Sequence, residues 1–188
     1  MNSNLTFDVG LAAKLKIALS RNDWTEQQID AACEGDKLGQ FRQVLLGHAE
    51  IKQIEHVINC DADPFVPSGW KVEEHQKGGQ WKFDAAQIEL YLADAQKKGT
   101  IEGNKLRKLL AGKLVLNACV LDYLLAHREL IPEEWKGKAI FFWGTIYRSS
   151  GGRLYVRCLC WDGGRWSWGY YWLGIGWDGD DPAALRAS

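Results

Sequence analysis

The stretch RLYVRCLCWDGGRWSWGYYWL, residues 153–173, decides how the C-terminal third of this chain folds. Strand-forming residues lie on both sides of a DGG sequence, which is typical of two β-strands joined by a tight hairpin turn. A third run of this kind, KAIFFWGTIYR at 138–148, comes before an SSGG turn. We therefore predict a three-stranded antiparallel meander with strands at 139–148, 153–161 and 165–173.

The turn at Gly163-Gly164 sets the register between the second and third strands. A two-residue loop there places Asp162 opposite Arg165 and continues the pairing along both strands. The further predicted pairs are Trp161 with Trp166, Leu159 with Trp168, Arg157 with Tyr170, and Tyr155 with Trp172.

A four-residue SSGG loop sets the register of the first hairpin, with Arg148 opposite Arg153 and Phe142 opposite Leu159. Since side chains alternate between the two faces of a strand, the tryptophans of the third strand share one face. We regard this face as the candidate binding surface. Its aromatic and basic members are Tyr155, Arg157, Trp161, Trp166, Trp168, Tyr170 and Trp172.

The opposite face of the meander is also apolar, so exposure of either face to water is unfavourable. Each buried aromatic ring removes about 150–250 Å² of surface from solvent, and a dozen exposed rings would exceed the apolar patches that monomers normally show. We expect helices to cover one face. The second face is covered by the protein's own core, by a partner chain or second copy, or by a ligand.

Helical periodicity dominates the sequence ahead of the meander. Three short N-terminal helices are predicted at 8–20, 25–33 and 37–47, and a capping box from Thr25 to Gln28 opens the second. The middle is predicted to hold helices at 85–98, 101–112 and 116–127, with Asn117 as the cap of the last, and one small hairpin at 70–84.

These elements predict an α+β fold. Short N-terminal helices and a helical middle with a small hairpin precede the C-terminal three-stranded antiparallel meander. We divide the chain into an N-terminal helical unit, residues 1–58, and an α+β domain, residues 59–188.

The composition argues against several classes of function. The net charge of −1 over 188 residues gives no overall attraction to duplex nucleic acid or to an anionic membrane. No apolar run approaches the roughly 20 residues that span a bilayer, and the N-terminal segment lacks the ordered parts of a signal peptide. Five cysteines without a CxxC motif are typical of reduced thiols in a cytosolic protein. We therefore expect a cytoplasmic protein without a cofactor.

No known catalytic motif occurs in the sequence. The CDADP sequence at 60–64 fits an Asx-type turn before a proline. The acidic DGDD sequence at 178–181 lacks the glutamate that would close a calcium loop. A dyad of Cys119 with His127 depends on geometry that their spacing does not define. We assign no catalytic and no metal-binding residue.

Three segments, LNACVLDYLLAHRELIPEEWKGKAIFFWGTIYR, LYVRCLCWDGGRWSWGYYWL and DPAAL, together resemble a group of uncharacterised small bacterial proteins. Members share the IPEEWKG turn, the FWGTIYR strand and a tryptophan-rich end. The resemblance covers residues 60–188 and implies a bacterial cytosolic protein. It implies no activity, because none is assigned to the group.

These observations favour a non-enzymatic binding protein whose aromatic C-terminal sheet engages a protein partner or a second copy of itself. The alternative is a protein that binds single-stranded nucleic acid or carbohydrate on the tryptophan-rich face, because unstacked bases and sugar rings both stack on aromatic side chains. An enzyme with an unrecognised Cys/His/Asp site is the third hypothesis. No membrane partner is expected.

Overall fold

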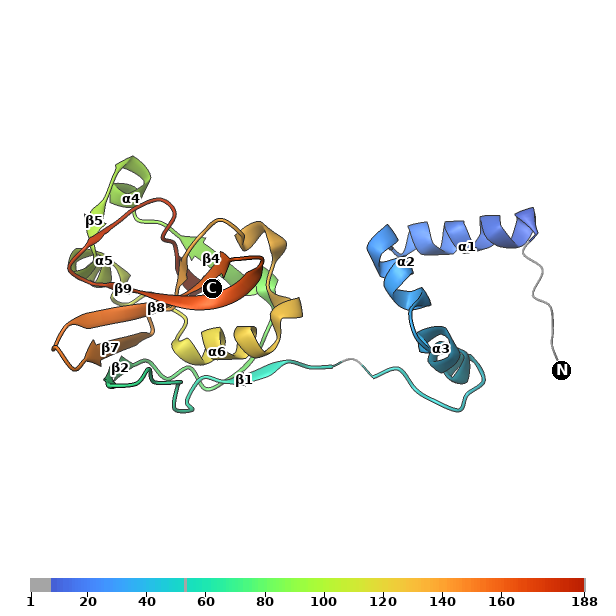
Figure 1. Cartoon of the computed structure of the whole chain (residues 1–188), viewed down its shortest axis with the longest axis horizontal. Coiled ribbons are helices and arrows are strands. Elements are labelled where there is room, and N and C mark those ends of the chain that lie inside the picture. Colours follow the sequence, from blue (N-terminus) through green and yellow to red (C-terminus); the bar gives the residue numbers. More distant parts are fainter. Residues whose placement is uncertain (1–7, 53, 188) are drawn as a thin grey trace. The chain divides into compact units, whose positions relative to one another are not determined.

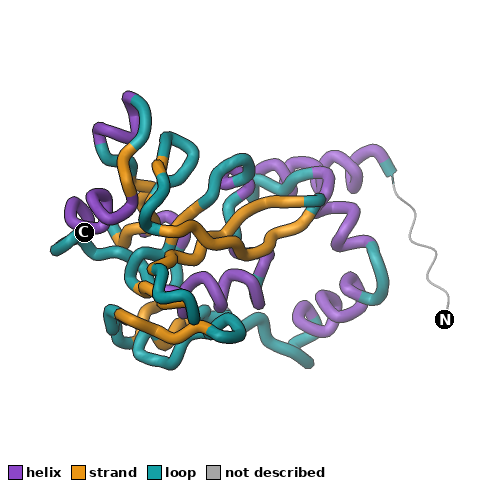
Figure 2. The backbone as a smooth tube through the Cα atoms, turned by 60° about the vertical axis from the view of Figure 1, so that its left-hand side comes forward, coloured by secondary structure: helices purple, strands orange, loops and turns teal. Residues whose placement is uncertain are grey.

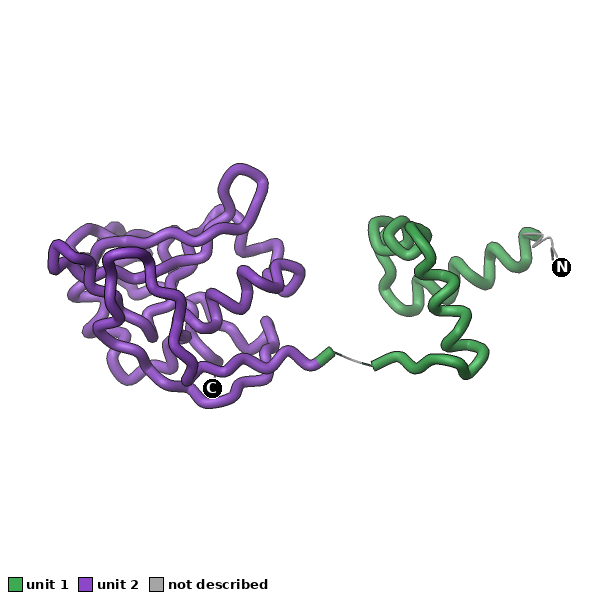
Figure 3. Tube along the Cα trace, turned by 60° about the horizontal axis from the view of Figure 1, so that its bottom comes forward, with its two compact units in different colours: residues 1–54 green, residues 55–188 purple. Residues whose placement is uncertain are grey.

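The computed structural model describes residues 8–52 and 54–187. The chain divides into two compact units, Met1–Ile54 and Glu55–Ser188, which Figure 3 draws in separate colours. The division falls slightly ahead of the boundary at 58/59 that the sequence suggests.

The first unit consists of three short helices, α1 (Val9–Arg21), α2 (Glu26–Cys33) and α3 (Lys37–Leu45). The predicted capping box is confirmed, because Thr25 Oγ1 accepts from the Gln28 N–H and the Gln28 side chain accepts from the Thr25 N–H. None of the three helices contains a buried residue. Across the described part of the chain, no helix has both the length and the apolar composition to cross a membrane.

The second unit is built around a seven-stranded sheet (Figures 1 and 2). Its central strand, β8 (Leu154–Asp162), has β9 (Arg165–Trp172) along one edge. The other edge of β8 pairs with two strands in succession, β7 (Thr145–Ser149) and β6 (Ile140–Phe141). The sheet continues from β7 to β2 (Trp70–His75), and from β6 through β11 (Ala183–Arg186) to β4 (Ile88–Tyr91).

Two further sheets have two strands each. They pair β1 (Val57–Asn59) with β3 (Gln80–Lys82), and β5 (Ile101–Glu102) with β10 (Gly176–Trp177). The helices of this unit are α4 (Asp94–Lys98), α5 (Gly103–Leu110) and α6 (Ala118–Ala126), and its 3₁₀ turns are η1 (Ala85–Gln87), η2 (Arg128–Leu130) and η3 (Glu133–Trp135).

The predicted α+β fold, with its helical middle and three-stranded meander, is wrong, because the second unit is dominated by a seven-stranded sheet. The stretch 85–98, expected as one helix, forms η1, β4 and α4 instead. Tertiary pairing overrides the helical periodicity here, since β4 pairs antiparallel with β11. β11 has a weak strand signal of its own, because its AALR sequence is rich in alanine, a residue depleted in strands.

The small hairpin expected at 70–84 is not formed either. Its two segments become β2 and β3, but β2 pairs with β7 and β3 pairs with β1. Both segments therefore find partners that are distant in the sequence.

The predicted register of the β8–β9 hairpin is confirmed, from Asp162 opposite Arg165 to Tyr155 opposite Trp172. The turn residue Gly163 has φ 56° and is followed by a second glycine with φ 78°. A two-residue type I′ turn requires positive φ at both positions, which glycine adopts without strain.

The predicted register of the first hairpin is wrong, because 139–148 is not one strand. The chain leaves the ladder at 142–144, between β6 and β7. Arg148 therefore lies opposite Leu154. Tyr147 lies on the same side of the sheet as Arg157, with its ring centroid 6.0 Å from the guanidinium carbon.

Both faces of the central strands are covered by the protein's own helices. On one face, Leu121 of α6 belongs to the same buried cluster as Leu159 and Trp166. On the other face, Leu106 of α5 belongs to a second cluster with Val156. The apolar character of both faces of the hairpin is therefore explained largely by burial within this unit.

Gly144 lies in the segment between β6 and β7, and its lack of a side chain allows the first residues of α6 to pack closely against this segment. A Cβ atom at this position would lie 2.9 Å from the backbone of Asn117, the N-cap of α6. We expect Gly144→Ala to lower the free energy of unfolding by about 1–3 kcal/mol. The added Cβ would clash with the backbone of Asn117, which cannot move aside as the end of a flexible side chain could. Urea denaturation measures the change.

The control is Gly151→Ala in the SSGG turn, where the nearest atom to the added Cβ is 3.8 Å away. This variant should stay within about 0.5 kcal/mol of wild type. Equal stability of the two variants would contradict the close approach at Gly144.

Candidate functional site

Arg157 is the one charged member of the predicted aromatic face, and the structure buries it. Its side chain is 1% exposed, and its Nη1 donates to Asp122 Oδ1 at 2.8 Å. The second carboxylate oxygen of Asp122 accepts from the backbone N–H of Phe65 at 2.9 Å. One carboxylate on α6 therefore joins β8 to the loop that precedes β2.

The guanidinium of Arg157 also lies between two aromatic rings. Its carbon is 4.9 Å from the ring centroid of Phe65 and 4.7 Å from that of Trp168. The carbonyl of Phe65 accepts from Arg157 Nη1 and from the hydroxyl of Tyr147. We call these five residues, Phe65, Asp122, Tyr147, Arg157 and Trp168, the arginine latch. Within the latch, the charge of Arg157 is buried and paired with Asp122, so the guanidinium is not available to bind a phosphate from solvent.

The predicted row of aromatic residues is graded from buried to open along β9. Trp166, at 4% exposure, belongs to the core under α6, and Trp161 and Trp168 pack partly against the same cluster. At the far end of the strand, Tyr170 is 50% exposed and Trp172 is 37% exposed. The row is thus neither wholly core nor wholly surface.

Trp70, at the start of β2, extends this aromatic cluster across the sheet. Its ring stacks on Tyr155 with centroids 4.5 Å apart and meets Tyr170 edge-on at 4.9 Å. Neither Trp70 nor Phe65 was predicted to belong to this row. Both lie within the segment PFVPSGW, residues 64–70, whose aromatic residues were the available signal.

The outer edge of β9 lacks a partner strand among the described residues. Leu173 N–H donates to Leu154 O, so residues 165, 167, 169 and 171 face β8 by the alternation of an antiparallel ladder. The backbone N–H and C=O groups of Trp166, Trp168 and Tyr170 therefore point away from the sheet. No charged residue occurs between Arg165 and Asp178.

A second polar cluster joins the CDADP segment to the start of α6. Thr145 Oγ1 accepts from the N–H of Ala118, and the hydroxyl lies 2.8 Å from His75 Nδ1. The other ring nitrogen, Nε2, lies 3.2 Å from the carbonyl of Cys60. With a proton on Nε2, the ring donates to this carbonyl.

Cys119 lies beside this histidine, not beside His127 as considered above. Its Sγ is 3.9 Å from His75 Nε2 and 3.2 Å from the carbonyl of Ala62, to which the thiol donates. Asn117 donates to the carbonyls of Cys60 and Gln76, both at 2.8 Å. Each polar group has a partner within the protein, so the cluster holds the loop in place and leaves no free base for the thiol.

The pKa values agree with this structural role. The pKa of Cys119 is raised to about 11, mainly by burial and, to a smaller extent, by the neighbouring Cys60 and the carboxylates of Asp122, Asp63 and Asp61. Burial also raises the pKa of Cys60. Both thiols are therefore protonated at neutral pH, which does not favour nucleophilic chemistry at CDADP or at Cys119.

The acidic DGDD segment forms a closed turn. Asp178 Oδ1 accepts from the N–H of Asp180, and the N–H of Asp178 donates to the buried Asp181. Burial raises the pKa of Asp181 to about 6. Within residues 8–52 and 54–187, no group of three or more histidine, cysteine or acidic side chains is placed to hold a metal ion.

Most of the residues that organise these clusters were not predicted from the sequence. Asn117 was predicted as a helix cap, and this is confirmed because its side chain accepts from the Cys119 N–H. Asp122 is a lone carboxylate in the apolar helix ACVLDYLLA, a signal of a buried ion pair. His75 has no such local signal.

Comparisons of this chain with known protein families, curated proteins and solved structures find no match. The function is therefore argued from the arrangement of residues described above.

Removal of Asp122 tests the arginine latch. We expect Asp122→Ala to lower the free energy of unfolding by about 3 kcal/mol, because the buried Arg157 charge loses its compensation. Chemical denaturation measures the loss. Asp63→Ala, an exposed carboxylate in the same loop, is the control and should change stability by less than about 0.5 kcal/mol. A similar loss in both variants would contradict a specific role for the ion pair.

The thiols should differ in their rates of alkylation. Cys160 is partly exposed, and the neighbouring Cys158 thiol lowers its pKa to about 6. With iodoacetamide at pH 7.5, we expect exposed Cys33 and partly exposed Cys160 to react first and Cys60, Cys119 and Cys158 to stay protected in the native state. Peptide mass spectrometry follows each site. Alkylation of Cys119 as fast as Cys33 would argue for an activated thiol.

Proposed function

We propose that this chain is a non-enzymatic interaction protein that binds another polypeptide strand along the free edge of β9. The observation that carries the proposal is the outer edge of this eight-residue strand, which no described strand pairs with and which lies beside exposed Tyr170 and Trp172. A free edge offers a row of backbone donors and acceptors to an incoming strand.

The composition of β9 supports pairing with another chain. Native proteins usually protect such edges with charged residues, prolines or bulges. β9 is paired with β8 without a register shift, and 166–177 contains no charge and no proline. An added strand would also cover the open end of the aromatic row.

The occupant that we propose is the β9 edge of a second copy. Outward-facing groups lie at every second residue, so an antiparallel pairing centred on Gly169 places Trp168 of one copy opposite Tyr170 of the other. The same register pairs the backbones of Trp166 and Trp172, but the Trp166 ring is already buried under α6, so the aromatic contacts across the interface come from Trp168 with Tyr170. Aromatic pairs across strands contribute about 0.2–1 kcal/mol each, and no like charges meet in this segment.

A cytosolic location belongs to this proposal. All five cysteines are free, and one of them, Cys33, is exposed. Free exposed thiols suit a reducing compartment.

The ligand-binding alternatives receive less support. Single-stranded nucleic acid requires a basic groove beside its stacking platform, but Arg157 is compensated by Asp122. Arg153 lies 4.8 Å from the ring centroid of Trp172 and adds a cation at the open end. Carbohydrate binding on Tyr170 and Trp172 stays a prediction.

Two variants at one position test strand pairing. Tyr170→Pro removes an outward-facing N–H without removing a bond to β8, whereas Tyr170→Ala removes the ring and keeps the N–H. We expect wild type to dimerise and the proline variant to raise the dissociation constant about tenfold or more, since two hydrogen bonds are lost per dimer. Sedimentation velocity over a concentration series measures the constant.

The alanine variant should associate more tightly than the proline variant. Near-UV circular dichroism confirms that both variants keep the native packing. A wild-type chain that stays monomeric throughout the series overturns self-association through β9. So does a proline variant that associates as tightly as the alanine variant.

A further inference from the structure

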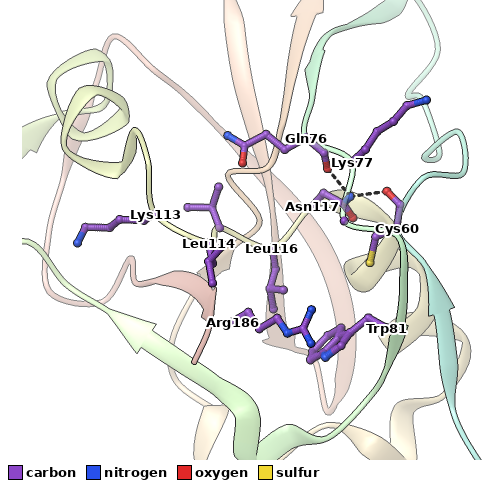
Figure 4. Close-up of a pocket in the computed structure, with 11 residues that line it drawn as sticks. Cys60, Gln76, Lys77, Trp81, Lys113, Leu114, Leu116, Asn117 and Arg186 are labelled. Carbon is purple, nitrogen blue, oxygen red and sulfur yellow. Dashed lines mark hydrogen bonds between the residues drawn. The ribbon is translucent and has the colours of Figure 1, made fainter. Parts of the chain in front are cut away.

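A pocket of about 190 Å³ opens between the start of α6, the end of β11 and the loop after β2 (Figure 4). Leu114 and Leu116 form apolar walls, and the backbone N–H of Arg186 donates to the carbonyl of Leu114. Cys60 and Asn117 lie on the side nearest the second polar cluster. None of the lining residues belongs to β9, so this pocket is separate from the proposed interaction edge.

The charged residues that line the pocket are all cationic: Lys77, Lys113 and Arg186. In the described chain none of them forms an ion pair. Figure 4 shows the two lysines extending outward on opposite sides and the Arg186 guanidinium below Leu116, next to Trp81. Arg186 is therefore the cation placed to contact a molecule in the pocket.

Trp81 holds the Arg186 guanidinium in position. The guanidinium carbon lies 5.6 Å from the ring centroid of Trp81, which is 2% exposed. No side-chain hydrogen bond of Arg186 is formed within the described residues, so its N–H donors are free for a ligand. A planar guanidinium with free donors matches a carboxylate in a two-bond arrangement.

The pocket is smaller than the sites of about 300–1,000 Å³ that take drug-sized ligands. Burial raises the pKa of the Cys60 thiol, so at neutral pH this lining residue carries no negative charge that would repel an anion. The pocket thus combines free cationic donors, apolar walls and a limited volume.

We propose that this pocket binds a small organic carboxylate. The carboxylate is held by Arg186, and its short apolar body lies against Leu114 and Leu116. Lys77 and Lys113 extend outward from the rim of the pocket, so they attract the anion through their charge without contacting it.

The test uses butyrate, its neutral isostere butyramide, and inorganic phosphate as probes of the full-length chain. Heteronuclear NMR follows the indole N–H of Trp81 at constant ionic strength. We expect butyrate to shift this resonance saturably and butyramide to bind at least tenfold more weakly. Equal binding of the amide, tighter binding of phosphate, or no response to butyrate overturns the proposal.

Arg186→Gln should weaken butyrate binding at least tenfold. Arg186 is exposed and its side chain makes no hydrogen bond with any residue that the structure describes, so this variant keeps the fold. Arg165→Gln, which removes the same charge at the exposed β8–β9 turn, is the matched control and should bind butyrate as wild type does. Equal affinities in the two variants overturn the assignment to Arg186. Dimerisation through β9 can fail without changing these outcomes.

Discussion

The ion pair between Arg157 and Asp122 is the constraint on which the second unit depends. Moving a guanidinium out of water costs several kcal/mol, which only a well-placed partner can offset. Here the carboxylate, the carbonyl of Phe65 and two aromatic rings surround the charge. The pair connects the central strand, its covering helix and the loop before β2, so these three parts must fold together.

This arrangement also explains why the aromatic row has two roles. Where α6 and the latch reach it, β9 contributes Trp166 and Trp168 to the interior. Beyond the reach of α6, Tyr170 and Trp172 remain open. The enrichment in tryptophan therefore serves packing at one end of the strand and is available for recognition at the other.

Local chemistry made part of this structure predictable. The DGG turn determined the β8–β9 register, and Thr25 and Asn117 marked two helix starts, because turns and caps depend on neighbours in the sequence. The seven-stranded sheet was not predictable in this way. β4 and β11 form strands because they pair with each other, and the cluster around His75 collects residues from separate elements. Periodicity contains no information on such distant partners.

The placement of β11 between β6 and β4 has a consequence for folding kinetics. The β8–β9 hairpin closes through a two-residue turn, whereas β4 must wait for a partner on the order of ninety residues further along the chain. During synthesis, β6 and β4 are made before the strand that joins them. The edges of β4 and β6 that pair with β11 therefore stay unpaired until β11 has been made, and this interval exposes apolar strand edges to chaperones.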